Sequence, residues 1–235
     1  MNIPDLPPFW AVIPAAGVGS RMRADRPKQY LSLAGKSILE HTLDCFLDHP
    51  RLKGVVVSLA ADDPYWPELA CARDPRIHRA PGGRERADSV FNALQTLGEL
   101  GAEPTDWVLV HDAARPNLAR SDLDNLLMTL AHDPVGGLLA VPARDTLKRA
   151  DADGRVSQTV DRSVIWQAYT PQMFHLEPLR RALADAQDAG ATITDESSAM
   201  EWAGLSPRLI EGRGDNLKVT RPEDLQWLAQ RWAQR

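Results

Sequence analysis

A run of small residues with two cations close behind it is the part of this sequence best suited to bind a polyphosphate. Residues 14–22 read Pro-Ala-Ala-Gly-Val-Gly-Ser-Arg-Met, and Lys28 follows shortly after. Gly17 and Gly19 tolerate backbone angles that other residues avoid, so several N–H groups of such a loop can point at one anion. Arg21 and Lys28 add positive charge beside the loop. The segment therefore predicts a polyphosphate site, and hence a nucleotide site.

The loop matches neither of the two common nucleotide-binding motifs. A P-loop continues with Gly-Lys-Ser/Thr, whereas Gly19 is followed by Ser20 and Arg21. A dinucleotide fingerprint has a small residue three places after its second glycine, where this chain has Met22. An ordinary glycine-rich turn is the alternative, and the nearby cations and Pro27 favour the nucleotide site.

Other polar residues follow apolar runs or small-residue turns, and each has two interpretations. Asp112 could hold Mg²⁺ or could cap a helix. Arg115 could bind a phosphate through two hydrogen bonds or pair with a surface acid. Gly83 could present backbone groups to a base edge or lie in a solvated loop, and Lys218 could hold a phosphate or be a surface lysine. His111 has no serine or cysteine partner at a recognisable spacing, which favours a packed histidine over a catalytic base.

The elements that position these residues can be predicted from apolar patterns. Buried strands are expected at four short apolar runs, residues 10–13, 55–59, 107–110 and 138–141. Amphipathic helices are expected between and after them, with starts or apolar faces at Ser37 with Glu40, residues 90–97, Ser121 with Asp124, and Thr220 with Glu223. Alternating strands and helices predict an α/β fold with a mostly parallel sheet and helices on both faces. Ligands bind such sheets beyond the carboxyl ends of the strands. The small-residue loop at 14–22, called the opening loop below, and Asp112 are both expected at such ends.

Residues 144–167 break the alternation. Two polar, strand-forming runs flank Asp153-Gly154, a strong hairpin-turn signal. A lone two-stranded hairpin is marginal in water, so it must lean on its own domain or on another subunit. With no linker rich in glycine or serine, residues 1–235 are expected to form a single domain with a projecting β-hairpin arm at about 144–167.

Composition narrows the classes of partner. The chain has 235 residues, 43% hydrophobic and 25% charged, with a net charge of −5, as is ordinary for a globular protein. No tract is dominated by lysine and arginine, which argues against nucleic acid as a partner. The two cysteines, Cys45 and Cys71, lack metal or redox spacing and suggest free thiols in a reducing compartment. Neither a signal peptide nor a membrane span is predicted, so the cytoplasm is the expected location.

Taken together, the motifs resemble those of one family, the 2-C-methyl-D-erythritol 4-phosphate cytidylyltransferases, a branch of the sugar-phosphate nucleotidyltransferases. The resemblance covers about residues 10–228. It rests on eight motifs in order along the chain, at residues 14–30, 82–90, 110–116, 144–149, 159–162, 170–172, 192–196 and 215–222.

The resemblance implies a Rossmann-like α/β fold, a dependence on Mg²⁺ and a homodimer joined through the hairpin arm. It implies an enzyme that transfers CMP from CTP to 2-C-methyl-D-erythritol 4-phosphate, with release of pyrophosphate, in the non-mevalonate isoprenoid pathway. Two alternatives remain, a ribitol-5-phosphate cytidylyltransferase and a non-catalytic nucleotide-binding regulator. Against the regulator, the chain has every charged residue expected around the α-phosphate: Arg21, Lys28, Asp112 and Lys218.

The resemblance also implies a role for individual residues. The cytidine site would be formed by five residues, Ala15, Ala16, Gly17, Gly83 and Ser89. The catalytic cations would be Arg21, Lys28, Arg162 and Lys218, and Asp112 would take part in the Mg²⁺ site. The acceptor would meet Arg115, Thr170, Thr194 and Lys218, joined by Thr146 and Arg162 from the arm of the other subunit.

The chemistry that these residues suggest needs no general base. The nucleophile would be an oxygen of a phosphate monoester, which is already anionic at neutral pH because its second pKa is about 6. The obstacle is then repulsion between two polyanions. Catalysis should rest on positioning the reactants and on stabilising charge at the α-phosphorus.

Overall fold

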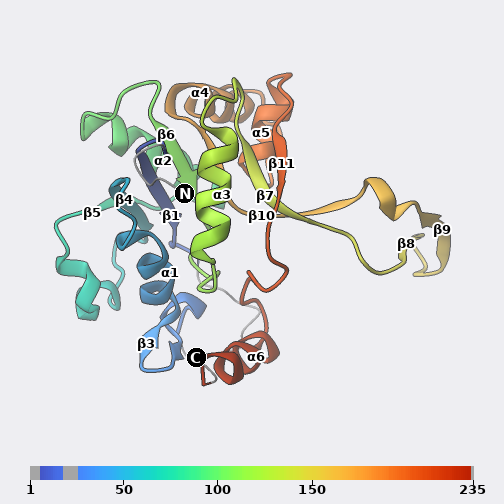
Figure 1. Ribbon diagram of the computed structural model, residues 1–235, viewed down its shortest axis with the longest axis horizontal. Coiled ribbons are helices and arrows are strands. Elements are labelled where there is room, and N and C mark those ends of the chain that lie inside the picture. Colours follow the sequence, from blue (N-terminus) through green and yellow to red (C-terminus); the bar gives the residue numbers. More distant parts are fainter. Residues whose placement is uncertain (1–5, 18–25, 234–235) are drawn as a thin grey trace.

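A seven-stranded sheet forms the centre of the computed structural model, which describes residues 6–17 and 26–233 (Figure 1). β10 is antiparallel to its neighbours β6 and β7, and the other neighbouring pairs are parallel. The mostly parallel sheet expected from the sequence is confirmed. The strand order is β11 (Arg208–Glu211), β7 (Gly137–Pro142), β10 (Trp166–His175), β6 (Trp107–Val110), β1 (Phe9–Pro14), β4 (Leu52–Leu59) and β5 (Ile77–Pro81).

Helices cover both faces of the sheet, as expected. The first face carries α1 (Ile38–Leu47) and α3 (Arg120–Leu130), and the second carries α2 (Arg86–Glu99), α4 (Leu176–Asp188) and α5 (Glu196–Trp202). Strand side chains alternate between faces, so β1 contributes Ala11 and Ile13 to the first core and Val12 to the second. Burial on both faces explains why β1 has an unbroken apolar sequence.

A smaller core joins the C-terminal helix to the rest of the molecule. Leu228 of α6 (Pro222–Trp232) packs with Val219 and with Leu33 of the short hairpin β2 (Ser32–Leu33) and β3 (Lys36–Ser37). Val219 is also tied to the segment after β6, since its N–H donates to the carbonyl of Ala114 at 2.8 Å. These contacts hold residue 218 near the carboxyl end of β6. The described residues also form short 3₁₀ helices, η3 (Lys28–Tyr30), η4 (Trp66–Glu68), η5 (Ala70–Arg73) and η6 (Arg162–Val164).

The projecting hairpin is present. β8 (Leu147–Ala150) and β9 (Val156–Val160) form a separate antiparallel pair that extends away from the sheet (Figure 1). Gly154 has a φ of 75° in the turn between them, which only glycine adopts easily. The arm leaves from β7 and returns into β10, and those two strands pair with each other at its base.

The predicted helix starts are only partly correct. The capping box of α1 is confirmed, because the Glu40 N–H donates to Ser37 Oγ at 3.2 Å and the Ser37 N–H donates to Glu40 Oε2 at 2.9 Å. The predicted start of α3 at Ser121 is wrong. The carbonyl of Ala119 accepts from two amides of the first turn, so α3 begins at Arg120 and Ser121 lies inside it.

The expected pairing of Thr220 with Glu223 at the start of α6 is also wrong. Asp224 takes this part, and its Oδ2 accepts hydrogen bonds from the N–H groups of Thr220 and Arg221, each at 2.8 Å. Arg221 is therefore the N-cap residue. Separately, none of the helices in the described ranges has both the length and the apolarity needed to cross a membrane.

Candidate active site

A cavity of about 540 Å³ opens where β1, β5 and β6 end. Pro14 stands at its β1 side, Glu85 at the start of α2, and Ala113 beyond β6. Eight of the residues predicted from the sequence line this one cavity: Ala15, Ala16, Gly17, Lys28, Gly83, Ser89, Asp112 and Lys218. The cavity lies where parallel α/β sheets bind ligands, at the carboxyl ends of neighbouring strands.

The two small-residue loops of the cavity touch each other. A Cβ atom on Gly82 would lie 2.3 Å from the Cβ of Ala16, so the approach requires glycine at this position. Ser89 then holds the second loop, since its Oγ accepts from the Gly83 N–H at 2.9 Å and its carbonyl accepts from Ser58 Oγ at 2.6 Å. The result is a wall of backbone with little side-chain bulk.

Lys28 and Gln29 reach the cavity from η3. Lys28 Nζ donates to the carbonyl of Val219 at 3.1 Å, next to Lys218. Gln29 is buried, and its Nε2 donates to the carbonyls of Ala15 at 2.6 Å and Gly17 at 3.0 Å. Lys28 thus stands at the cavity wall while its neighbour fastens the opening loop.

Asp112 is the centre of a cluster of charges. Its Oδ1 accepts from Arg86 Nε at 3.0 Å, and its Oδ2 lies 3.1 Å from Arg115 Nε and 3.0 Å from Lys218 Nζ. Burial alone would raise the pKa of Asp112, but the three cations outweigh it and hold that pKa well below its ordinary value. The carboxylate is therefore charged at every working pH.

Arg86 joins Asp112 to a second buried carboxylate. Its Nη1 donates to Glu196 Oε1 at 2.6 Å and its Nη2 to Glu196 Oε2 at 3.0 Å, a bidentate pair. Burial would lower the pKa of Arg86, but Glu196 and Asp112 raise it above its ordinary value. The pair ties the start of α2 to the start of α5. Both residues lie in motifs of the sequence, but their ion pair could not be predicted because they are 110 positions apart in the chain.

His111 is a packed histidine. Its Nε2 lies 3.0 Å from the carbonyl of Arg115, which only accepts, so Nε2 bears the proton and Nδ1 accepts from Thr170 Oγ1 at 2.9 Å. Burial lowers the pKa of His111 to about 4, which leaves the ring neutral at pH 7. The Thr170 hydroxyl also accepts from the Asp112 N–H at 3.1 Å. Arg115 and Thr170 thus both hold Asp112 in place, Arg115 through the carboxylate and Thr170 through the backbone N–H.

The other predicted residues lie elsewhere. Thr194 is exposed directly before α5 and does not line the cavity. Thr146 and Arg162 are exposed on the arm and do not line the cavity of the same chain. Arg21 lies outside the described residues.

The donor set suits a magnesium ion shared with a ligand. No group of three or more His, Cys, Asp or Glu side chains that could hold a metal occurs in the ranges 6–17 and 26–233. Mg²⁺ commonly takes only one or two carboxylates and completes its shell with water and substrate phosphates, so Asp112 alone fits. A metal on Asp112 would replace one of its present partners. Lys218 is the most accessible, with 36% of its side chain exposed against 26% for Arg86 and 9% for Arg115.

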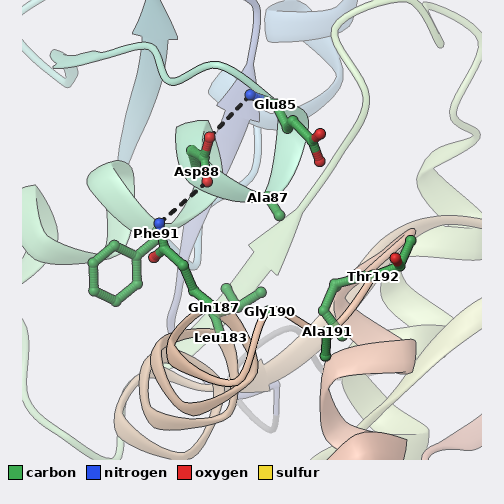
Figure 2. A pocket seen from close by; sticks show the side chains of 10 residues that line it. Glu85, Ala87, Asp88, Phe91, Leu183, Gln187, Gly190, Ala191 and Thr192 are labelled. Carbon is green, nitrogen blue, oxygen red and sulfur yellow. Dashed lines mark hydrogen bonds between the residues drawn. The ribbon is translucent and has the colours of Figure 1, made fainter.

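A second cavity of about 280 Å³ lies between the first turns of α2 and the end of α4 (Figure 2). Phe91 of α2 and Leu183 of α4 contribute apolar surface, and Asp88 and Gln187 contribute polar groups. None of the predicted site residues lines it. Glu85 lines both cavities, so the first residues of α2 form the wall between them.

Comparison with known proteins gives one consistent result. The family model described as 2-C-methyl-D-erythritol 4-phosphate cytidylyltransferase matches residues 9–233. The protein of that name from Pseudomonas putida strain W619 is 75% identical over 233 residues, 99% of each chain. The one from Pseudomonas fluorescens strain SBW25 is 75% identical over 230 residues, 98% of each chain.

Solved structures agree with the sequence relatives. A crystal structure of 4-diphosphocytidyl-2C-methyl-D-erythritol synthase is 41% identical, with a TM-score of 0.82 and coverage of 95% of this chain and 97% of the other. The 2-C-methyl-D-erythritol 4-phosphate cytidylyltransferase of Francisella tularensis is 34% identical, also with a TM-score of 0.82, over 96% and 99% of the two chains.

Proposed function

Because the chain belongs to the 2-C-methyl-D-erythritol 4-phosphate cytidylyltransferase family, we propose that it transfers CMP from CTP to 2-C-methyl-D-erythritol 4-phosphate. The products are 4-diphosphocytidyl-2-C-methyl-D-erythritol and pyrophosphate. The chain spans 99% and 98% of the length of these two relatives.

One observation supports this function above the others. Lys28, Lys218 and Asp112 line a single cavity, and the small residues Ala15–Gly17 and Gly83 line it too. Backbone groups beside small residues suit a base and a ribose, and the two ammonium groups suit a triphosphate. A nucleotide bound there has its phosphates at the cations.

The charges determine what the residues do in the reaction. Lys28 and Lys218 neutralise the repulsion between the triphosphate and the acceptor phosphate, and they stabilise the charge that develops at the α-phosphorus. Arg86 and Arg115 hold the Asp112 carboxylate in place. Asp112 would hold Mg²⁺, which when bound supplies further positive charge to the phosphates.

No residue of the cavity is needed as a general base. The acceptor phosphate is anionic at pH 7, as its second pKa is about 6. His111, the one histidine next to Asp112, is buried and neutral, with both ring nitrogens engaged. The site therefore acts by positioning the acceptor phosphate for in-line attack and by charge stabilisation.

We further propose that residues 1–235 form one nucleotidyltransferase domain that works as a homodimer through the arm. Val156 and Val164 are 64% and 74% exposed there, an apolar surface that a partner would cover. Thr146 and Arg162 would then reach the acceptor site of the other subunit, together with Thr194 of that subunit. We also propose the cytoplasm as the location, a reducing compartment in which the thiols of Cys45 and Cys71 would persist.

A pyrophosphate-release assay tests the function. The protein is incubated with CTP, Mg²⁺ and either 2-C-methyl-D-erythritol 4-phosphate or ribitol 5-phosphate. We expect kcat/KM to be about a hundredfold higher with the methylerythritol acceptor. A preference for ribitol 5-phosphate would identify the other cytidylyltransferase, and CTP binding without release from either acceptor would identify a regulator.

A further inference from the structure

Two buried glutamines each fasten one loop through a side-chain amide. Gln29 lies behind the small-residue loop after β1, and Gln172 lies behind the turn that begins α5. We propose that they are positioning residues with separate tasks, Gln29 for CTP and Gln172 for the acceptor. The proposal rests on the function proposed above.

Gln29 fixes the direction of the opening loop. Its amide nitrogen has two hydrogens, and the carbonyls of Ala15 at 2.6 Å and Gly17 at 3.0 Å accept one each. In a trans peptide the C=O and the next N–H point in opposite directions, so the Ala16 N–H is turned away from Gln29. The Ala15 N–H is already taken by the carbonyl of Ser58 at 2.9 Å. Fixing the Ala15 carbonyl therefore decides where the Ala16 N–H, on the cavity wall, can point.

Gln172 acts on the turn before α5, which lies outside the lining of the cavity. Its Oε1 accepts from the Ser197 N–H at 2.7 Å, and its Nε2 donates to Asp195 Oδ2 at 2.9 Å. The second oxygen of Asp195 caps α5 by accepting from the Ser198 N–H at 2.9 Å. Gln172 therefore ties β10 to the first turn of α5. Thr194, the predicted acceptor residue, comes immediately before that turn.

The chemistry of both sites requires an amide. Gln29 must donate twice to carbonyls, and Gln172 must donate to a carboxylate and accept from an amide. Ionised glutamate has the same shape but cannot donate, and it would place a negative charge against the same acceptors. Methionine has a similar volume and removes both donors without adding charge. The methionine variant therefore reports the loss of the hydrogen bonds alone, and the glutamate variant adds the effect of charge repulsion.

The test measures KM for each substrate in four variants: Gln29→Met, Gln29→Glu, Gln172→Met and Gln172→Glu. Losing two buried hydrogen bonds should raise the affected KM about tenfold. For the Gln29 variants that is KM for CTP, with KM for 2-C-methyl-D-erythritol 4-phosphate changed by less than about twofold. For the Gln172 variants KM for 2-C-methyl-D-erythritol 4-phosphate should rise about tenfold and KM for CTP by a smaller factor, because the same turn holds Glu196, the partner of Arg86. The two positions are therefore compared by which KM rises more.

Calorimetric titration with CTP gives a second readout that needs no acceptor. The dissociation constant should rise about tenfold in both Gln29 variants and by a smaller factor in both Gln172 variants, because the turn that Gln172 fastens also holds Glu196, the partner of Arg86. Variants that melt at lower temperature but keep both KM values, or that raise both KM values equally, would overturn the proposal. Failure of the proposed function would differ, because the parent protein would then release no pyrophosphate with the methylerythritol acceptor.

Discussion

At the residue scale, the site is a set of cations arranged around one carboxylate. Asp112 accepts hydrogen bonds from Arg86, Arg115 and Lys218. Lys28 donates to the carbonyl of Val219, the residue after Lys218. The two arginines are the less exposed partners, which suits them to holding the carboxylate. The two lysines line the cavity, which suits them to meeting a ligand.

Replacing Lys28 by alanine should lower kcat about 10²–10³-fold, by analogy with the removal of other electrostatic stabilisers. The melting temperature should change little, because the lysine lies at the cavity wall and outside the apolar cores. Steady-state kinetics and thermal melting measure the two effects.

Lys36→Ala is the matched control, since Lys36 is an exposed lysine paired with Asp44 away from the cavity. If kcat of the Lys28→Ala variant stayed within about threefold of the parent, Lys28 would have no part in holding the phosphates.

The sequence was a good guide to residues whose chemistry is local. Lys28, Asp112 and Lys218 follow small-residue turns or a strand end, and the cavity contains all three. Gln29 and Glu196 were missed because their roles depend on partners that only folding brings close. A glutamine next to a lysine is no sequence signal. The role of Gln29 becomes visible only when the fold brings its amide within hydrogen-bonding distance of the carbonyls of Ala15 and Gly17.

At the element scale, β10 has more than one task. It lies in the sheet between β6 and β7 and follows the arm in the chain. It also carries Thr170, which contacts His111 and Asp112, and Gln172, which contacts the start of α5. This strand could not be predicted from the sequence, because Trp166–His175 mixes polar residues with Pro171 and lacks a continuous apolar run. The hairpin before it was predicted well, because Asp153-Gly154 determines a turn locally.

Arg162→Ala should raise KM for 2-C-methyl-D-erythritol 4-phosphate about tenfold, with KM for CTP nearly unchanged, if the arm meets the acceptor. Arg155→Ala is the matched control, since Arg155 is an exposed arginine at the turn of the same arm. Gel filtration of both variants checks that the oligomeric state is the same. An equal rise in both KM values would show that Arg162 does not distinguish the acceptor.

At the scale of the whole molecule, the net charge of −5 opposes the binding of two anionic substrates. Four cations, Lys28, Arg84, Arg86 and Lys218, line the cavity at one end of three strands, where five segments of the chain meet. Burial of polar groups such as His111 behind this end makes the stability of the fold depend on pH.

The pKa of His111 is lowered by burial from about 6.5 to about 4. Below pH 6.5 the unfolded chain binds this proton and the folded chain does not, so stability falls as the pH falls towards 4. Between pH 7 and pH 5 the loss should be about 2 kcal/mol in the free energy of unfolding.

Urea denaturation of the parent and of His111→Gln at the two pH values measures this loss. The variant should be less sensitive to pH by that amount. His49, whose pKa burial also lowers, is present in both proteins and cancels in the comparison. Equal pH dependence in parent and variant would contradict the assignment to His111.

The arm enters and leaves the sheet at a single point, because Pro142 and Trp166 are partners in the β7–β10 ladder. The two ends of the arm are already held together in the sheet. Lengthening the segment between them therefore costs little loop-closure entropy and does not shift the register of the strands. The hairpin can therefore change in length and sequence over evolution while the nucleotide cavity, assembled from distant segments, remains constrained. Acceptor preference would then be the more rapidly evolving property of the fold, and use of CTP the more conservative one.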